Sequence, residues 1–206
     1  MGAFFSYIVL GLSLSAPIGP INAAQLDKGI KHGFGSAWLV GIGAMIADIC
    51  FMFLIYFGLA QFINIPIVKV FLWLFGGFIL LYTGIDSIIH AGKEIQETQP
   101  STSYKKSFLT GFLMALSNPL NIIFWLGIYG SILANTMAQY SMGTLLFYSS
   151  GIFVGILIWD AVMAYVASTV GKWDNQRLLK TISLIAGVVL VGFGIYFTSQ
   201  AAQIIL

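Results

Sequence analysis

Polar and charged residues divide the chain into six long apolar segments, over residues 3–25, 36–61, 66–89, 108–134, 142–168 and 180–203. Each segment is long enough to cross a bilayer as a helix, which needs roughly 20 apolar residues. The period-2 alternation typical of strands is absent from all six segments. The pattern therefore predicts an all-α polytopic membrane protein with six transmembrane helices.

The first segment is interrupted at its centre. Residues 1–26 hold no charged residue and no histidine, yet Pro17, Gly19 and Pro20 stand in the middle of this run. Proline removes a backbone donor and clashes with the preceding turn, so the helix is expected to break at membrane depth. Broken backbone is tolerated there only where it is buried in protein or lines a polar cavity. We therefore predict that this break forms half of a transport site.

Composition agrees with a membrane protein. The 206 residues are 59% hydrophobic and 8% charged, with a mean hydropathy of +0.95, which a soluble domain of this size does not reach. The first segment lacks the basic start of a signal peptide, so we expect it to be retained. Cys50 is the one cysteine, so no disulfide and no cysteine-pair metal site can form within one chain.

Lysine and arginine gather in alternate links between the segments. All of them except Lys69 fall in residues 27–35, 90–107 and 171–180, whereas the links around residues 61–64 and 135–141 carry no charge. Basic links face the cytoplasm, so both termini are predicted to lie outside. Trp38 and Trp173 stand beside basic links, where interfacial aromatic residues are expected.

The halves of the chain share motifs in the same order. Residues 93–107 form a polar connector in the cytoplasm, and residues 1–92 and 108–206 would each supply three helices of opposite orientation. This is the inverted-repeat plan of many transporters. Each predicted helix of the first half has one match in the corresponding helix of the second half. In the first helices Ser15 to Pro17 matches Ser117 to Pro119. In the second, Gly43 and Asp48 match Gly155 and Asp160, and in the third, Gly77 and Gly84 match Gly187 and Gly194.

Two acids lie deep in apolar segments. Asp48 and Asp160 each sit well inside a predicted helix, where a charge costs several kcal/mol unless it faces a polar cavity or is neutralised. An acid that gains and loses a proton there suits a proton-coupled carrier, and a carboxylate also suits a substrate ammonium group. The alternative is a protonated aspartate that only links two helices.

The two proline breaks suit a negatively charged group, whereas the two acids suit a positively charged one. A helix that restarts at Pro20 or after Pro119 presents backbone N–H groups and the positive end of its dipole, which bind carboxylates. The alternative at each break is a simple proline kink. Acids and helix ends together match a zwitterionic amino acid, although inorganic ions remain an alternative. The predicted substrate-binding residues are Ser15, Pro17, Gly19, Pro20, Asn22, Ser117, Asn118, Pro119 and Asn121, with Asp48 and Asp160 for proton coupling.

Other polar and aromatic residues carry weaker signals. Asp86 and His90 are four residues apart on one helical face and are expected to form an interfacial pair, with a gate as the alternative. Trp125 and Trp159 are expected to face lipid rather than to line a cavity. Gln25 has no specific predicted role. Glycine-rich faces permit a homodimer, and six glycines are expected to mark close helix packing: Gly41, Gly43, Gly151, Gly155, Gly187 and Gly194.

With these motifs the chain resembles the LysE/RhtB-type translocators of bacteria over essentially its whole length. The resemblance rests on Ser15 to Pro20, on the glycine-rich stretch from Gly41 to Asp48 in the second predicted helix, and on Asn118-Pro119-Leu120. The family's lysine after asparagine and proline is Leu120 here, and Ile18 separates Pro17 from Gly19. The resemblance implies proton-driven export of amino acids or close derivatives across the cytoplasmic membrane. It implies a transporter in contact with lipid and not an enzyme, with no cofactor and no nucleic-acid partner.

Competing functions remain open on the sequence alone. A divalent-cation exporter would need more oxygen or soft ligands at depth than the aspartates, asparagines and hydroxyls readily supply. A membrane enzyme finds no support, since the sequence has no HExxH element, no Ser/His/Asp set and no cysteine pair. A structural subunit without a substrate is the third alternative. The residues do not determine which amino acid is carried, the direction of transport, the coupling ion or the oligomeric state.

Overall fold

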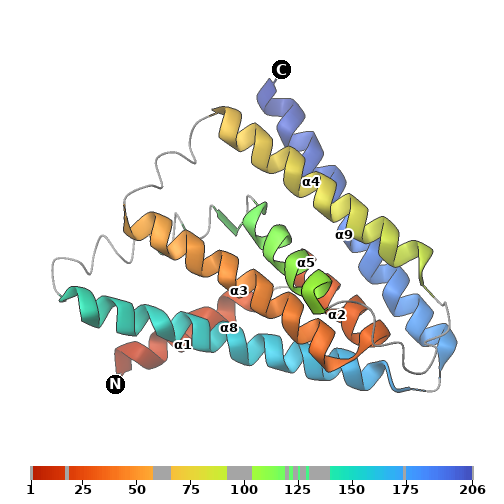
Figure 1. Cartoon of the computed structure of the whole chain (residues 1–206), viewed down its shortest axis with the longest axis horizontal. Helices are drawn as coiled ribbons and strands as arrows, with labels where there is room; N and C mark the ends of the chain where they lie inside the picture. The colour runs from red at the N-terminus through yellow and green to blue at the C-terminus, as the bar shows by residue number, and fades with distance from the viewer. Residues whose placement is uncertain are drawn as a thin grey trace.

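Helices account for all of the regular structure that is described. The computed structural model of the chain describes residues 2–16, 19–57, 66–91, 104–118, 121–122, 125, 129, 140–173 and 175–205. Within these ranges the elements are α1 (Gly2–Ser15), α2 (Pro20–His32), α3 (Phe34–Tyr56), α4 (Pro66–Ile89), α5 (Tyr104–Leu116), α8 (Met142–Val170) and α9 (Gln176–Ile205) (Figure 1). The all-α prediction is confirmed for the described part of the chain.

Several of these helices are long and apolar enough to cross a membrane. Three single helices qualify, over Phe34–Tyr56, Gly143–Val170 and Gln176–Ile204, and the bent pair of α1 and α2 makes a fourth span if it crosses as one. A shorter apolar helix covers Trp73–Ile89 in α4. The chain is an integral membrane protein. The predicted segment 108–134 is described through α5 but only in part beyond it, so the count of six stays a prediction.

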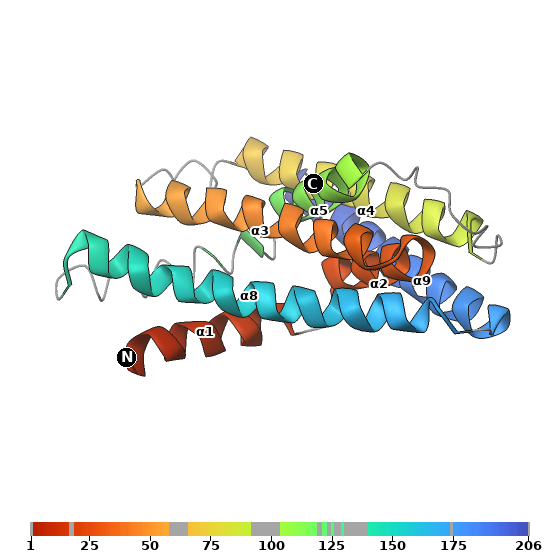
Figure 2. The same ribbon diagram turned by 60° about the horizontal axis from the view of Figure 1, so that its bottom comes forward.

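The helices pack in pairs that join the first half of the chain to the second. α4 lies along α9, α3 along α5, and α1 along α8, and these are the most extensive helix contacts among the described elements. In Figure 1 the α4–α9 pair forms one side of the molecule, and Figure 2 shows α1 beneath α8. The short helix α2 lies between the two groups and contacts α3, α8 and α9.

Glycines bring α4 and α9 together along an antiparallel seam. A Cβ on Gly84 would collide with the backbone of Gly187, and a Cβ on Gly77 would crowd Thr198 and the Gly194 carbonyl. This confirms the prediction that Gly187 and Gly194 mark close helix packing. Farther along the same seam Trp73 meets Phe197 edge to face, with ring centroids 5.0 Å apart.

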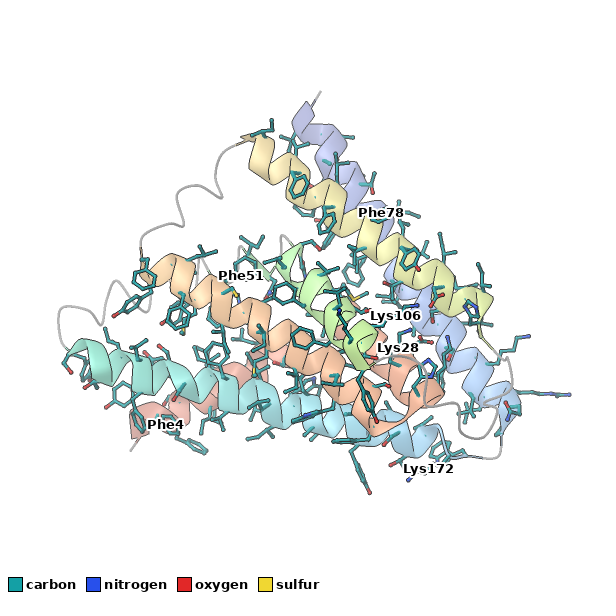
Figure 3. All side chains as sticks on the ribbon, viewed as in Figure 1. Phe4, Lys28, Phe51, Phe78, Lys106 and Lys172 are labelled. Carbon is teal, nitrogen blue, oxygen red and sulfur yellow. The ribbon has the colours of Figure 1, made fainter. Side chains whose placement is uncertain are left out.

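The first predicted link is wrong. Residues 27–35 were predicted to form a basic link between two helices, but α2 continues to His32 and only Gly33 separates it from α3. Gly33 has a φ of +80°, which suits a residue without a side chain. The helix continues because its charges are matched within the protein: Asp27 and Lys28 are 1% and 4% exposed. In Figure 3 Lys28 lies among the packed helices, whereas Lys172 lies at the edge of the molecule.

A buried polar cluster joins α2 to α4 and α9. We call Asp27, Lys31, Ser87 and Ser183 the Asp27 cluster. The Asp27 carboxylate is 2.6 Å from the Lys31 ammonium and accepts a hydrogen bond from the Ser87 hydroxyl at 2.7 Å. Lys31 also donates to the Ser87 carbonyl at 3.0 Å, and the Ser87 hydroxyl lies 3.2 Å from the Ser183 carbonyl. These contacts tie the C-terminal half of α2 to the α4–α9 pair.

Candidate functional site

The predicted helix break is present. α1 ends at Ser15, α2 begins at Pro20, and the two helices are inclined to each other by 75°. Proline suits the first position of a helix because its missing N–H has no partner there in any case. Gly19 precedes it in an extended conformation, and no side chain caps this first turn. Pro17 lies outside the described residues.

A cavity of about 360 Å³ opens at this break. It is bounded by the end of α1, the start of α2, the middle of α3 and α8, the segment after α5, and one residue of α9. Its lining residues are Leu14, Ser15, Gly19, Pro20, Ile21, Asn22, Ala44, Asp48, Asn118, Asn121, Trp125, Ile156, Asp160 and Phe193.

Most residues that the sequence singled out line this one cavity. Ser15, Gly19, Pro20, Asn22, Asn118 and Asn121 are among them, and so are Asp48 and Asp160. Ser117 is buried, and its hydroxyl donates to the Leu113 carbonyl within its own helix rather than facing the cavity. Pro119 and Leu120 lie outside the described residues. The tertiary structure thus brings together groups that are far apart in the sequence.

Asp48 of α3 is held by two donors from the segment after α5. Its Oδ1 accepts a hydrogen bond from Asn121 Nδ2 at 2.6 Å and another from Trp125 Nε1 at 2.9 Å. The expectation that Trp125 faces lipid is wrong, since its ring is 1% exposed and stacks on Phe153. A buried indole is held inward because its N–H has an acceptor there.

Asp160 of α8 has a different partner. Gln25 of α2 donates from Nε2 to Asp160 Oδ1 at 3.0 Å, and the Gln25 side chain is fully buried. Gly41 of α3 lies directly over the pair, because a Cβ there would collide with Gln25 Nε2 and with the Asp160 carboxyl group. No specific role was predicted for Gln25. Its position three residues after Asn22, on one helical face, was the signal that could have identified it.

Asn22 connects both sides of the helix break to α8. Its side-chain nitrogen donates to the Ser15 carbonyl at 2.9 Å, and its side-chain oxygen accepts a hydrogen bond from Trp159 Nε1 at 3.2 Å. Trp159 was expected to face lipid, and this is wrong for its polar edge, which points to the break. The geometry of the cavity wall therefore depends on α8 as well as on α1 and α2.

The charges in the cavity are of one sign. Two carboxyl groups line it, and no lysine, arginine or histidine is among the described lining residues. The start of α2 brings the positive end of a helix dipole to the same space. The arrangement can receive an ammonium group or a proton at the acids and an anionic group at the start of α2.

The predicted Asp86–His90 pair lies elsewhere. His90 Nδ1 is 3.2 Å from Asp86 Oδ1, and neither residue lines the cavity. Lys28 approaches the same aspartate at 3.8 Å. Among the described residues there is no group of three or more His, Cys, Asp or Glu side chains that could hold a metal ion.

The sequence matches one protein family over most of its length. The family model described as LysE type translocator matches residues 12–201. The chain is 56% identical to the "Putative amino acid efflux protein YcgF" of Bacillus subtilis (strain 168), and the match covers 100% of both proteins. It is 26% identical to the "Leucine efflux protein" of Enterobacter sp. (strain 638), with 92% of each covered. The "Chemotactic transduction protein ChpE" of Pseudomonas aeruginosa is also 26% identical, over 77% of this chain and 79% of that protein. No solved structure matches the chain.

Proposed function

The chain belongs to the LysE type translocator family, whose members are transporters and not enzymes, and from this premise we propose that it exports amino acids or close derivatives. In this proposal the protein sits in the cytoplasmic membrane with both termini outside. Proton antiport drives transport, and the substrate site is the cavity at the break between α1 and α2.

One observation carries the proposal. Asp48, Asp160 and the uncapped start of α2 line the same cavity. A zwitterionic amino acid presents one ammonium and one carboxylate, which match the acids and the helix start respectively. The apolar part of the lining, such as Leu14, Ile156 and Phe193, would contact the substrate side chain.

Helix packing supports an inverted repeat. On α3, a Cβ on Gly43 would collide with the Phe108 carbonyl of α5, and on α8, a Cβ on Gly155 would collide with the Ile8 carbonyl of α1. Exchanging the halves turns one contact into the other: Gly43 corresponds to Gly155, as the sequence predicted, and Ile8 to Phe108. This register for α1 and α5 differs by two residues from the one that aligns Ser15 with Ser117.

The seam between α4 and α9 fits the same exchange. In the predicted repeat Gly77 corresponds to Gly187, and Gly84 corresponds to Gly194. Exchanging the two halves of the chain therefore turns the Gly84–Gly187 contact into the Gly77–Gly194 contact. Both contacts are present. We propose that residues 1–92 and 108–206 form two inverted three-helix repeats joined by the connector 93–107, with six transmembrane helices in all.

Alternating access would use a boundary that does not follow the sequence halves. Each extensive helix pair joins one half to the other, so the halves do not form separate bodies. We propose that the α4–α9 pair moves against the bundle of α1, α3, α5 and α8, with α2 and the cavity at the boundary. The Asp27 cluster would open and close as α2 moves relative to α4.

A proteoliposome assay tests this function. Vesicles with purified protein and an imposed pH gradient are loaded with radiolabelled leucine, threonine, lysine or arginine, and efflux is followed with the wild type, Asp48→Asn and Asp160→Asn. Each substitution is expected to lower proton-driven efflux at least tenfold, whereas Arg177→Gln, at an exposed charge outside the cavity, serves as the control. Normal proton-coupled efflux by both cavity variants would refute the carboxylate mechanism. Efflux of Mn²⁺ or Zn²⁺ with no effect on any amino acid would refute the substrate class.

A further inference from the structure

The pair formed by Gln25 and Asp160 has an incomplete set of hydrogen bonds. The Gln25 amide donates to Asp160 Oδ1, but Gln25 Oε1 and Asp160 Oδ2 are buried oxygens with no hydrogen-bond partner among the described residues. The two side chains are 0% and 4% exposed. Buried polar atoms are nearly always paired, so two unpaired oxygens in one contact need an explanation.

The other acid of the cavity lacks this feature. Asp48 Oδ1 accepts from Asn121 and Trp125, and neither oxygen of Asp48 is a buried atom without a partner. The two acids are equivalent in the predicted repeat but not in their hydrogen bonding. The structure therefore gives Asp160 a property that the sequence equivalence does not explain.

A single proton on Asp160 gives this pair of acceptors a donor. An ionised carboxylate and an amide carbonyl are acceptors only, so neither oxygen can satisfy the other. A proton on Asp160 Oδ2 turns that oxygen into a donor, and Gln25 Oε1 is an acceptor that lacks one. A neutral carboxyl group and a primary amide then match donor to acceptor in both directions.

We propose that Gln25 and Asp160 form the proton-binding unit of the transporter, with the proton on Asp160 Oδ2 and shared with Gln25 Oε1. The role in transport rests on the proposed function. Asp160 binds the proton, and Gln25 is a positioning residue. When the proton leaves for water, Asp160 Oδ1 still accepts the Gln25 N–H, so both states keep a hydrogen bond.

The surroundings of Asp160 are consistent with a neutral state. Asp48 is the charged group that shares its cavity, and it has the same sign. Lys28, the nearest cation along α2 from Gln25, is directed to Asp86 of α4 instead. From α3 the backbone of Gly41 lies against the pair. No described cation contacts Asp160 to hold it in the ionised form.

Infrared spectroscopy of the protein in liposomes tests the proposal without any substrate. A neutral carboxyl group gives a carbonyl stretching band separate from that of carboxylates and of the backbone. We expect such a band in the wild type. The band should disappear in Asp160→Asn and persist in Asp48→Asn. In Gln25→Leu the same band should move to higher frequency, because the carbonyl at Oδ1 loses its N–H donor.

The exchanged pair provides a second, independent variant. Gln25→Glu combined with Asp160→Asn moves the carboxyl group to α2 and the amide to α8, and the band should return. The proposal is overturned if the wild type shows no band, if the band persists in Asp160→Asn, if Gln25→Leu does not shift it, or if the folded exchanged pair lacks it. Failure of leucine or lysine efflux in the transport assay would instead count against the proposed function, since the band does not depend on a substrate.

Discussion

Asn22 donates a hydrogen bond to the Ser15 carbonyl across the helix break, with 2.9 Å between Nδ2 and the oxygen. Ser15 is the last residue of α1, so its carbonyl has no partner in a following helical turn. Asn22 stands in the first turn of α2 and supplies that partner from the other side of the break. Its oxygen is bonded to Trp159, so one side chain joins α1, α2 and α8.

Replacing Asn22 by aspartate should therefore weaken transport more than expression. The substitution keeps the acceptor for Trp159 but removes the donor to Ser15. Loss of a buried hydrogen bond that leaves its partner unsatisfied costs about 1–3 kcal/mol, so we expect efflux to fall roughly tenfold. Asn175→Asp is the matched control, because Asn175 caps α9 with its side-chain oxygen, which aspartate retains. Equal efflux by Asn22→Asp and the wild type would contradict this role.

The indole of Trp125 is expected to matter through its N–H group. Trp125→Phe keeps an aromatic ring against Phe153 but removes one of the two donors to Asp48. A hydrogen bond to a charged group contributes about 1.5–3 kcal/mol, so the substrate concentration for half-maximal efflux should change about tenfold or more. Trp173→Phe, at a half-exposed ring, should have no effect. A variant of Trp125 with unchanged kinetics would show that Asp48 does not need this donor.

Two glycine contacts test the packing of the proposed repeat. Gly43→Ala and Gly155→Ala both place a Cβ against the backbone of a neighbouring helix. Overpacking costs about 1–3 kcal/mol, so both variants should unfold at lower temperature, by similar amounts. Gly192→Ala is the control, since a Cβ at Gly192 meets no atom within 4 Å. Loss of stability in only one of the two glycine variants would count against equivalent packing.

The Asp27 cluster should make a large contribution to stability when one partner is removed. Lys31→Met leaves the carboxylate of Asp27 buried without its cation, and breaking a buried pair in this way costs about 3–5 kcal/mol. Combining Asp27→Asn with Lys31→Met removes both charges and should restore much of the loss, as thermal unfolding in detergent would show. Lys172→Met, at an exposed lysine, is the control. A stable single variant would show that the pair is not needed.

The apolar pattern predicted the helices well where each is a plain span. The predicted segment 66–89 coincides with α4, and 142–168 falls within α8. The prediction failed at residues 27–35 because a run of charges usually marks a solvated link. Here the charges of Asp27 and Lys31 are matched by each other and by Ser87, which is distant in sequence. Periodicity cannot reveal such a partner.

In the site, too, local signals could be read from the sequence and contacts with distant residues could not. Asp48, Asp160 and the proline break were recognisable from sequence, because charge and proline are exceptional at membrane depth. Trp125 and Gln25 were not, because an apolar helix can direct an indole or an amide either to lipid or to a buried acceptor. Which of these occurs depends on Asp48 and Asp160 on other helices.

The sequence by itself determined that the chain is helical and embedded in a membrane, that its first helix breaks at the prolines, and that Asp48 and Asp160 are buried. These properties follow from local composition and from the cost of charge and broken backbone in lipid. Only the tertiary structure decided that the break and both acids line one cavity, that Gln25 contacts Asp160, and that α4 packs on α9 rather than within its own half. Those relationships depend on contacts between distant segments, which no local pattern encodes.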